Sequence, residues 1–130
     1  MKDKEDVIRL LRRIFKSGII HRLPRKREDA EIFLALSLVG LDPDGFFDES
    51  KINIQLSSWL EGIASEDGIA DYVTLRRQLV DNGFLRRASD GVVYRIKPER
   101  IDEVLSPSAK TVDVKAIFTE VKLARSSRRR

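Results

Sequence analysis

Two adjacent arginine pairs, each preceded by a leucine, stand close together in the stretch DYVTLRRQLVDNGFLRR, residues 71–87. The guanidinium group is a planar fork of hydrogen-bond donors that matches both carboxylates and phosphates. Such arginines can bind an anionic ligand, or they can hold a small domain together through internal ion pairs. The position of each arginine on its helix or strand separates these two roles.

The first pair lies on a predicted helix that begins near Asp71 and ends at Asn82-Gly83, where glycine suits a left-handed cap. With about 100° of rotation per residue, Arg76 falls inside the apolar arc of this helix. A guanidinium group that points toward a core needs a partner, because a buried unpaired charge is very costly. Glu49, at the start of the preceding predicted helix, is the favoured partner, and Asp71 is the alternative. We therefore expect Arg76 and Glu49 to be structural.

The polar face of the same helix carries Thr74, Arg77 and Gln78, together with Asp81. Hydroxyl, guanidinium and amide groups suit contacts with base edges and phosphates in the DNA major groove. Asp81 adds a negative charge to this face, which would repel the phosphates of DNA. The alternative to a DNA-reading surface is therefore an ordinary solvated helix face.

A β-hairpin is predicted after this helix, because strand-like residues flank Asp90-Gly91, which is a strong signal for a tight turn. Arg86 and Arg95 are expected to share its outward face, with Arg87 near the turn and Lys97 at the exit. A basic wing of this kind could follow a phosphate backbone.

A further basic segment precedes a predicted helix start. It consists of Arg22, Arg25, Lys26 and Arg27. This segment could clamp a phosphate group, or Arg25 to Arg27 could only offset the acids Glu28, Asp29 and Glu31 that follow.

Charge is segregated along the whole chain, which has a net charge of +4. Residues 1–27 carry ten Lys and Arg against three acids, whereas residues 28–71 carry one Lys against eleven acids. The balance is seven against three in residues 72–100 and seven against four in residues 101–130. This asymmetry is expected of a nucleic-acid binder or of a polar surface for a partner, and the alternative is segregation without a function.

Several other classes of protein are disfavoured. The chain has no Cys and a single His, His21, so a disulfide or thiolate zinc site is impossible and no metal is expected. No phosphate-binding loop, glycine-rich dinucleotide turn or catalytic triad is recognisable, so we expect neither catalysis nor a cofactor. No apolar run reaches the length of a membrane span or a signal-peptide core, which predicts a soluble, cytoplasmic protein without a membrane partner.

The elements that must position these residues are mostly helical. Apolar residues at helical spacing predict helices over residues 4–16, 28–39 and 49–63, followed by the helix with the first arginine pair. Residues 99–112 are expected to be irregular, and a last short helix is expected from Val114. The predicted organisation is an N-terminal amphipathic helix (1–18), a winged-helix-like domain (19–98), a C-terminal extension with a short helix (99–124) and a disordered basic tail (125–130).

Several segments are similar to a known family. They are LPRK (23–26), FDESKIN (47–53), DYVTLRRQLVD (71–81), GFLRR (83–87), and Asp90-Gly91 with Tyr94. On these segments, residues 20–97 resemble a small bacterial domain, domain of unknown function 2087. The resemblance implies a winged-helix-like fold and an association with bacterial transcription regulators, and it implies no particular activity.

Three helices followed by a tight hairpin are the layout of a winged helix-turn-helix. The expected fold class is therefore mainly α with a small β-hairpin and with flanking N- and C-terminal helices. We expect a transcription regulator or accessory factor that binds double-stranded DNA, with the helix from Asp71 in or near the major groove. The alternative is a non-catalytic protein-interaction module that uses its acidic surface, or that forms a homodimer through its terminal helices.

Overall fold

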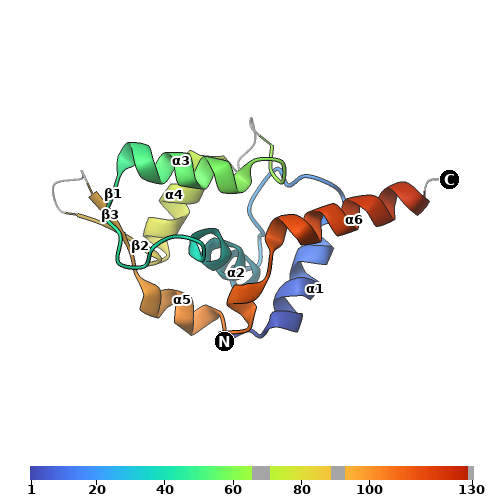
Figure 1. Cartoon of the computed structure of the whole chain (residues 1–130), viewed down its shortest axis with the longest axis horizontal. Helices are drawn as coiled ribbons and strands as arrows, with labels where there is room; N and C mark the ends of the chain where they lie inside the picture. The colour runs from blue at the N-terminus through green and yellow to red at the C-terminus, as the bar shows by residue number, and fades with distance from the viewer. Residues whose placement is uncertain (66–70, 89–92, 129–130) are drawn as a thin grey trace.

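The computed structural model describes residues 1–65, 71–88 and 93–128. In chain order the elements are α1 (Lys4–Phe15), α2 (Arg27–Leu38), β1 (Phe47–Asp48), α3 (Glu49–Leu60), α4 (Tyr72–Asp81), β2 (Leu85–Arg87), β3 (Val93–Ile96), α5 (Pro98–Val104), the 3-10 turn η1 (Ala109–Thr111) and α6 (Val114–Arg128). The sheet lies at one end of the molecule, and the terminal helices α1 and α6 lie at the other (Figure 1). Among the described residues, no helix combines the length and the apolar composition that crossing a membrane requires.

Four of the described helices begin after an aspartate whose side chain caps the first turn. Asp3, Asp48, Asp71 and Asp113 precede α1, α3, α4 and α6, and each side chain accepts a hydrogen bond from a backbone N–H of the first turn, at 3.0, 2.7, 2.7 and 3.1 Å. In α1 this hydrogen bond lowers the pKa of Asp3, because the backbone N–H of Asp6 stabilises the ionised carboxylate. The end of α4 is followed by Gly83 with a φ of +81°, as the sequence predicts.

The small sheet has three antiparallel strands in the order β1-β3-β2. β2 and β3 form the predicted hairpin, with Arg86 opposite Arg95. The predicted turn at Asp90-Gly91 lies outside the described residues. The sequence does not predict β1, which pairs Phe47 with Tyr94. A two-residue strand shows no alternation of its own, so pairing with β3 alone defines it.

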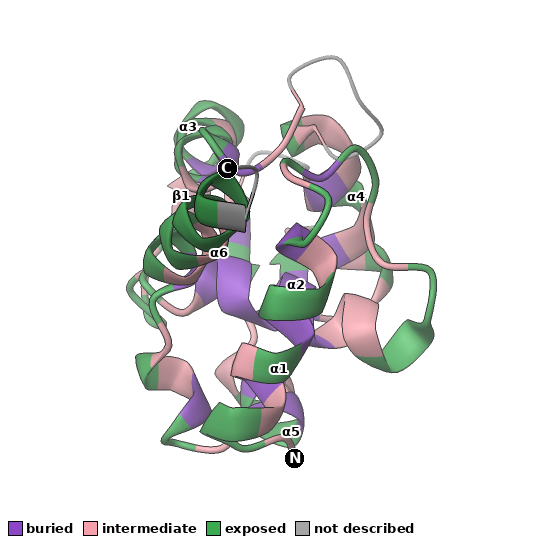
Figure 2. Ribbon diagram, turned by 90° about the vertical axis from the view of Figure 1, so that its right-hand side faces the viewer, coloured by how far each residue is buried: buried purple, intermediate pink, exposed green. Residues whose placement is uncertain are grey.

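The hydrophobic core is centred on α2. All residues of this helix from Ile32 to Leu38 are buried, and Phe33 has none of its surface exposed. The ring of Phe33 meets Trp59 of α3 edge to face, with 4.9 Å between the ring centroids. The buried residues gather where the helices face one another (Figure 2). The part of α2 from Ile32 to Leu38 is buried on all sides, so the surrounding elements have to enclose it, whereas its polar first turn reaches the surface.

The two terminal helices pack against each other. Phe15 of α1 and Phe118 of α6 are in edge-to-face contact with ring centroids 5.0 Å apart. At the edge of this contact, Arg12 Nη2 lies 2.8 Å from Glu120 Oε1. Apolar side chains of both helices are therefore covered within one chain. Pairing of these helices between two chains, which the sequence leaves open, would require this contact to open.

The chain after β3 is more regular than predicted. Residues 99–112 are not irregular throughout, because they contain most of α5 and all of η1. Pro98 occupies the first position of α5, where its missing N–H is not needed, and Ile101 and Val104 are buried. α6 runs to Arg128, so it is longer than the predicted short helix and extends into the predicted disordered tail.

Candidate nucleic-acid interface

Arg76 lies on the side of α4 that faces α3 and the sheet. Its side chain is 18% exposed, and its Nη2 atom lies 3.3 Å from Oε1 of Glu49, the partner that the sequence favours. The guanidinium group also donates a hydrogen bond to the side-chain oxygen of Asn53 and lies 6.0 Å from the centre of the Tyr94 ring. Arg76 thereby connects α4 to α3 and β3. No pattern in the sequence indicates Asn53 as a partner of Arg76.

The ion pair of Arg76 is less buried than expected, because the side chain of Glu49 is 55% exposed. The alternative partner, Asp71, caps α4 instead. Solvent screens the charge of Glu49, whereas the guanidinium end keeps its hydrogen bonds in a sheltered position. The stabilisation by Arg76 therefore lies between that of an exposed and that of a buried pair.

Replacing Arg76 by alanine is expected to lower the free energy of unfolding by about 1–2 kcal/mol, since the half-exposed pair falls between the two extremes. Urea denaturation followed by circular dichroism measures this difference. The exposed neighbour Arg77 offers a matched control, and Arg77→Ala should change the free energy of unfolding by less than ~0.5 kcal/mol. Equal losses in the two variants would contradict the structural role of Arg76.

The polar face of α4 divides into two edges. Arg77 and Asp81 are exposed on the outer edge, and Arg77 forms no ion pair with the described residues. Thr74 and Gln78 are half-buried on the inner edge, together with Asn82. The three residues that the sequence grouped as a DNA-reading surface are therefore separated: Arg77 faces solvent, whereas Thr74 and Gln78 face a cleft.

This cleft, which we call the basic cleft, lies between the inner edge of α4 and the basic segment before α2, with a volume of about 360 Å³. Its lining consists of Arg22, Leu23, Pro24, Arg25, Arg27, Ala30, Thr74, Gln78 and Asn82. Lys26 is the member of the basic segment that does not line it, and Lys26 occupies the N-cap position of α2. Arg27 is paired with Glu31, with 3.1 Å between Nε and Oε1. Arg22 and Arg25 form no ion pair with the described residues.

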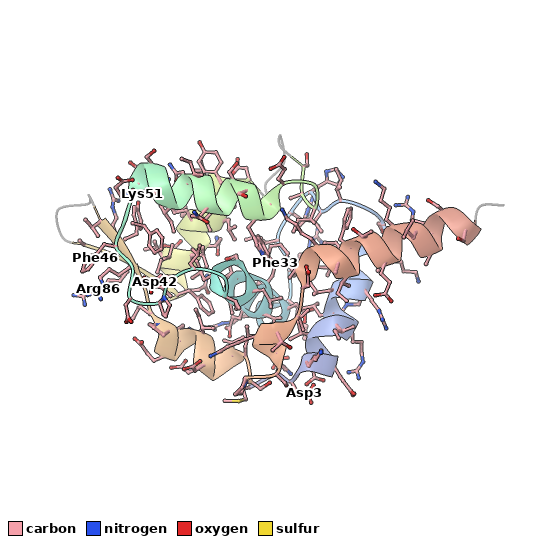
Figure 3. The ribbon with its side chains drawn as sticks, viewed as in Figure 1. Asp3, Phe33, Asp42, Phe46, Lys51 and Arg86 are labelled. Atoms are coloured by element: carbon pink, nitrogen blue, oxygen red, sulfur yellow. The ribbon has the colours of Figure 1, made fainter. Side chains whose placement is uncertain are left out.

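The wing, formed by β2 and β3, carries Arg86 and Arg95 directly opposite each other, and both are exposed as predicted. The guanidinium group of Arg95 lies 4.5 Å from the ring centre of Phe46, which is 66% exposed. Arg87 is also exposed, and Lys97 is half-buried where β3 ends. Phe46 and Arg86 lie at the sheet end of the molecule (Figure 3). None of these residues lines the basic cleft.

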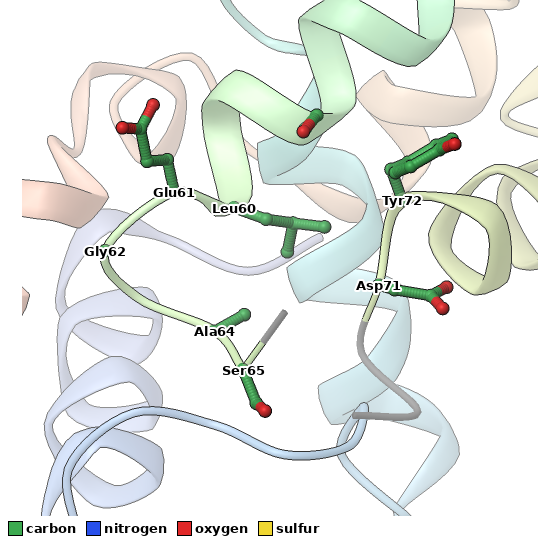
Figure 4. Close-up of a pocket in the computed structure, with 8 residues that line it drawn as sticks. Leu60, Glu61, Gly62, Ala64, Ser65, Asp71 and Tyr72 are labelled. Atoms are coloured by element: carbon green, nitrogen blue, oxygen red, sulfur yellow. The ribbon is translucent and has the colours of Figure 1, made fainter. Parts of the chain in front are cut away.

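A second recess, of about 340 Å³, lies between the end of α3 and the start of α4 (Figure 4). Its lining includes the carboxylates of Glu61 and Asp71, and none of the described residues that line it is Lys or Arg. The carboxylate of Asp71 is already used as the N-cap of α4. This recess is therefore a poor site for a phosphate group, because carboxylates and phosphates repel each other.

Arg100 of α5 connects several elements, a role that the sequence does not predict. Its Nε donates to the backbone oxygen of Asn82 at 3.0 Å, and its Nη2 lies 3.4 Å from Glu31 of α2. The guanidinium group also lies 4.6 Å from the ring centre of Phe84 and pairs with Glu103 at 3.2 Å. Arg100 thereby fixes the end of α4 relative to α2. Its segment is predicted as irregular, so no periodic pattern points to it.

The order of α2, β1, α3, α4, β2 and β3, with the sheet order β1-β3-β2, defines a mainly helical domain whose arrangement is consistent with a winged helix-turn-helix. The chain belongs to the family described as an uncharacterised protein conserved in bacteria, DUF2087, whose model matches residues 19–96. The match ends at the last residue of β3, so α1, α5, η1 and α6 flank the family domain. No curated protein and no solved structure shows a significant match to the chain.

Proposed function

We propose that this chain binds double-stranded DNA and serves as a bacterial transcription regulator or as an accessory factor of one. In this proposal the outer edge of α4 lies in or near the major groove, and the wing contacts the phosphate backbone. The observation that carries the proposal is the pair Arg86 and Arg95, which stand opposite each other on the exposed face of β2 and β3.

This arginine pair is unfavourable without a ligand, because like charges directly opposite each other destabilise an antiparallel pair of strands. Neither Arg86 nor Arg95 forms an ion pair with the described residues, and Phe46 covers one face of the Arg95 guanidinium group. A phosphate group between the two arginines would replace their repulsion with charge-assisted hydrogen bonds. An anionic polymer such as the DNA backbone is therefore a suitable partner for the wing.

The outer edge of α4 supports the same partner. Arg77 is exposed there, and its donor fork suits either the edge of guanine or a phosphate group. Asp81, one turn further along, is exposed on the same edge and repels phosphates. We therefore expect the DNA contact of α4 to be centred on Arg77 and to avoid the end of the helix.

The affinity for duplex DNA is expected to depend strongly on salt. If about five phosphates are contacted, log K should fall against log salt concentration with a slope of roughly −4 to −5. Fluorescence anisotropy of a labelled duplex, titrated at several salt concentrations between about 50 and 200 mM, measures this slope. A salt-insensitive complex, or no complex with any duplex, would count against DNA binding. That outcome would favour the interaction module, since the exposed acids Asp42, Asp44 and Asp48 suit a basic protein partner.

A further inference from the structure

The basic cleft is a second candidate anion site, separate from the wing. Thr74, Gln78 and Asn82 are spaced four residues apart and therefore lie along one edge of α4. Arg22 and Arg25 line the same cleft, and both are exposed and form no ion pair with the described residues. The cleft thus combines two cations with a row of neutral polar side chains.

The hydrogen bonds along this edge of α4 leave donors available. Asn82 Nδ2 donates to the backbone oxygen of Gln78 at 2.8 Å and to Gln78 Oε1 at 3.2 Å. The side-chain oxygen of Gln78 is thus occupied, whereas its Nε2 group and the Thr74 hydroxyl form no hydrogen bond with the described residues. Both side chains are half-buried beside the cleft, so both can donate to a group that enters it.

None of the described residues that line the basic cleft carries a carboxylate. A cleft beside α1 shows the contrast, because its cations Lys2, Arg9, Arg13 and Lys26 are accompanied by Asp6, Glu28 and Asp29. Arg27, which also lines the basic cleft, forms an ion pair with Glu31, which lies outside the lining. Among the described residues, no side chain that lines this cleft therefore offsets the charge of Arg22 and Arg25.

We propose that the basic cleft binds a phosphate group, carried either by a free small molecule or by a nucleic-acid backbone. Arg22 and Arg25 supply the positive charge, and Thr74 and Gln78 donate neutral hydrogen bonds to the remaining phosphate oxygens. The volume of about 360 Å³ lies within the range of small-molecule sites. The site shares no residue with the wing, so phosphate binding here does not depend on the role of Arg86 and Arg95.

Titration of sodium pyrophosphate into the isotope-labelled full chain, at constant ionic strength and without DNA, tests this site by NMR. We expect saturable shifts of the backbone amides at residues 22–27 and of the Gln78 side-chain amide. In the variant Arg22→Ala/Arg25→Ala, the affinity for pyrophosphate should fall by at least about tenfold, because charge-assisted hydrogen bonds are lost. Thr74→Val removes one hydroxyl at nearly constant shape and should have a smaller effect.

The matched control is Lys4→Ala/Lys122→Ala, which removes the same formal charge from exposed positions outside the cleft and should keep the wild-type affinity. Unsaturable shifts in the wild-type chain, or equal affinities of the two double variants, would overturn the site even if the wing binds DNA. Adding a DNA duplex to the pyrophosphate-saturated chain shows whether the phosphate group that this cleft binds belongs to a nucleic-acid backbone or to a free small molecule. Displacement of pyrophosphate identifies the nucleic-acid backbone, whereas pyrophosphate that stays bound identifies a free phosphorylated molecule.

Discussion

Replacing Arg86 and Arg95 together by alanine should weaken duplex DNA binding by roughly 10- to 100-fold at low salt and reduce the salt slope by about 2. In the proposed complex two phosphate contacts are lost, and each of them releases about one counterion on binding. The same variant should leave the free energy of unfolding nearly unchanged, because relief of the repulsion between two like charges offsets the lost contact of Arg95 with the exposed ring of Phe46. Loss of affinity at unchanged stability would distinguish a binding role from a structural one.

The control for the wing is again Lys4→Ala/Lys122→Ala. It removes the same formal charge from exposed positions on α1 and α6, at the end of the molecule opposite the sheet (Figure 1). Its DNA affinity should stay close to that of the wild-type chain, measured by anisotropy in the same buffer. If both double variants lose the same affinity, net charge governs binding. If neither loses any, the wing is not a contact surface and the proposed function is wrong.

Replacing Arg100 by alanine should lower the free energy of unfolding by about 2–4 kcal/mol, the largest stability effect that we predict for an arginine. The side chain of Arg100 is 20% exposed and that of its partner Glu31 is 21% exposed, so both ends of this ion pair are sheltered. Truncation also removes the hydrogen bond to the backbone oxygen of Asn82 and the stacking on Phe84. In this variant Glu31 keeps its ion pair with Arg27 but loses its ion pair with Arg100.

Two further variants make the Arg100 experiment specific, with urea denaturation as the measurement. Arg9→Ala breaks an exposed pair with Asp6 within α1 and should change the free energy of unfolding by less than ~0.5 kcal/mol. Arg100→Lys keeps the charge but loses the planar donor fork, so it should recover only part of the stability. A loss for Arg100→Ala no greater than that for Arg9→Ala would show that this contact does not hold α4 and α2 together.

The secondary structure of this chain follows largely from local patterns. The predicted positions of α1 to α4 and of the hairpin match the structure, because helical spacing, N-caps and turn residues act over a few neighbouring residues. The bond from the Thr74 backbone N–H to Asp71 is an example that needs only four consecutive residues. Helical geometry also separates the inward Arg76 from the outward Arg77 without knowledge of the rest of the fold.

Contacts between segments that are distant in the sequence could not be predicted, because the spacing of neighbouring residues does not determine them. β1 is a strand only because β3 pairs with it, and Arg100 meets Glu31 only because α5 packs beside α2. The sequence by itself determined α1 to α4, the two strands of the hairpin and the side of α4 on which each arginine lies. The tertiary structure decided that the segment with Arg22 and Arg25 meets Thr74 and Gln78 in one cleft while the wing lies apart. The physical reason is that packing around α2, and not the spacing of residues along the chain, sets the distances between these elements.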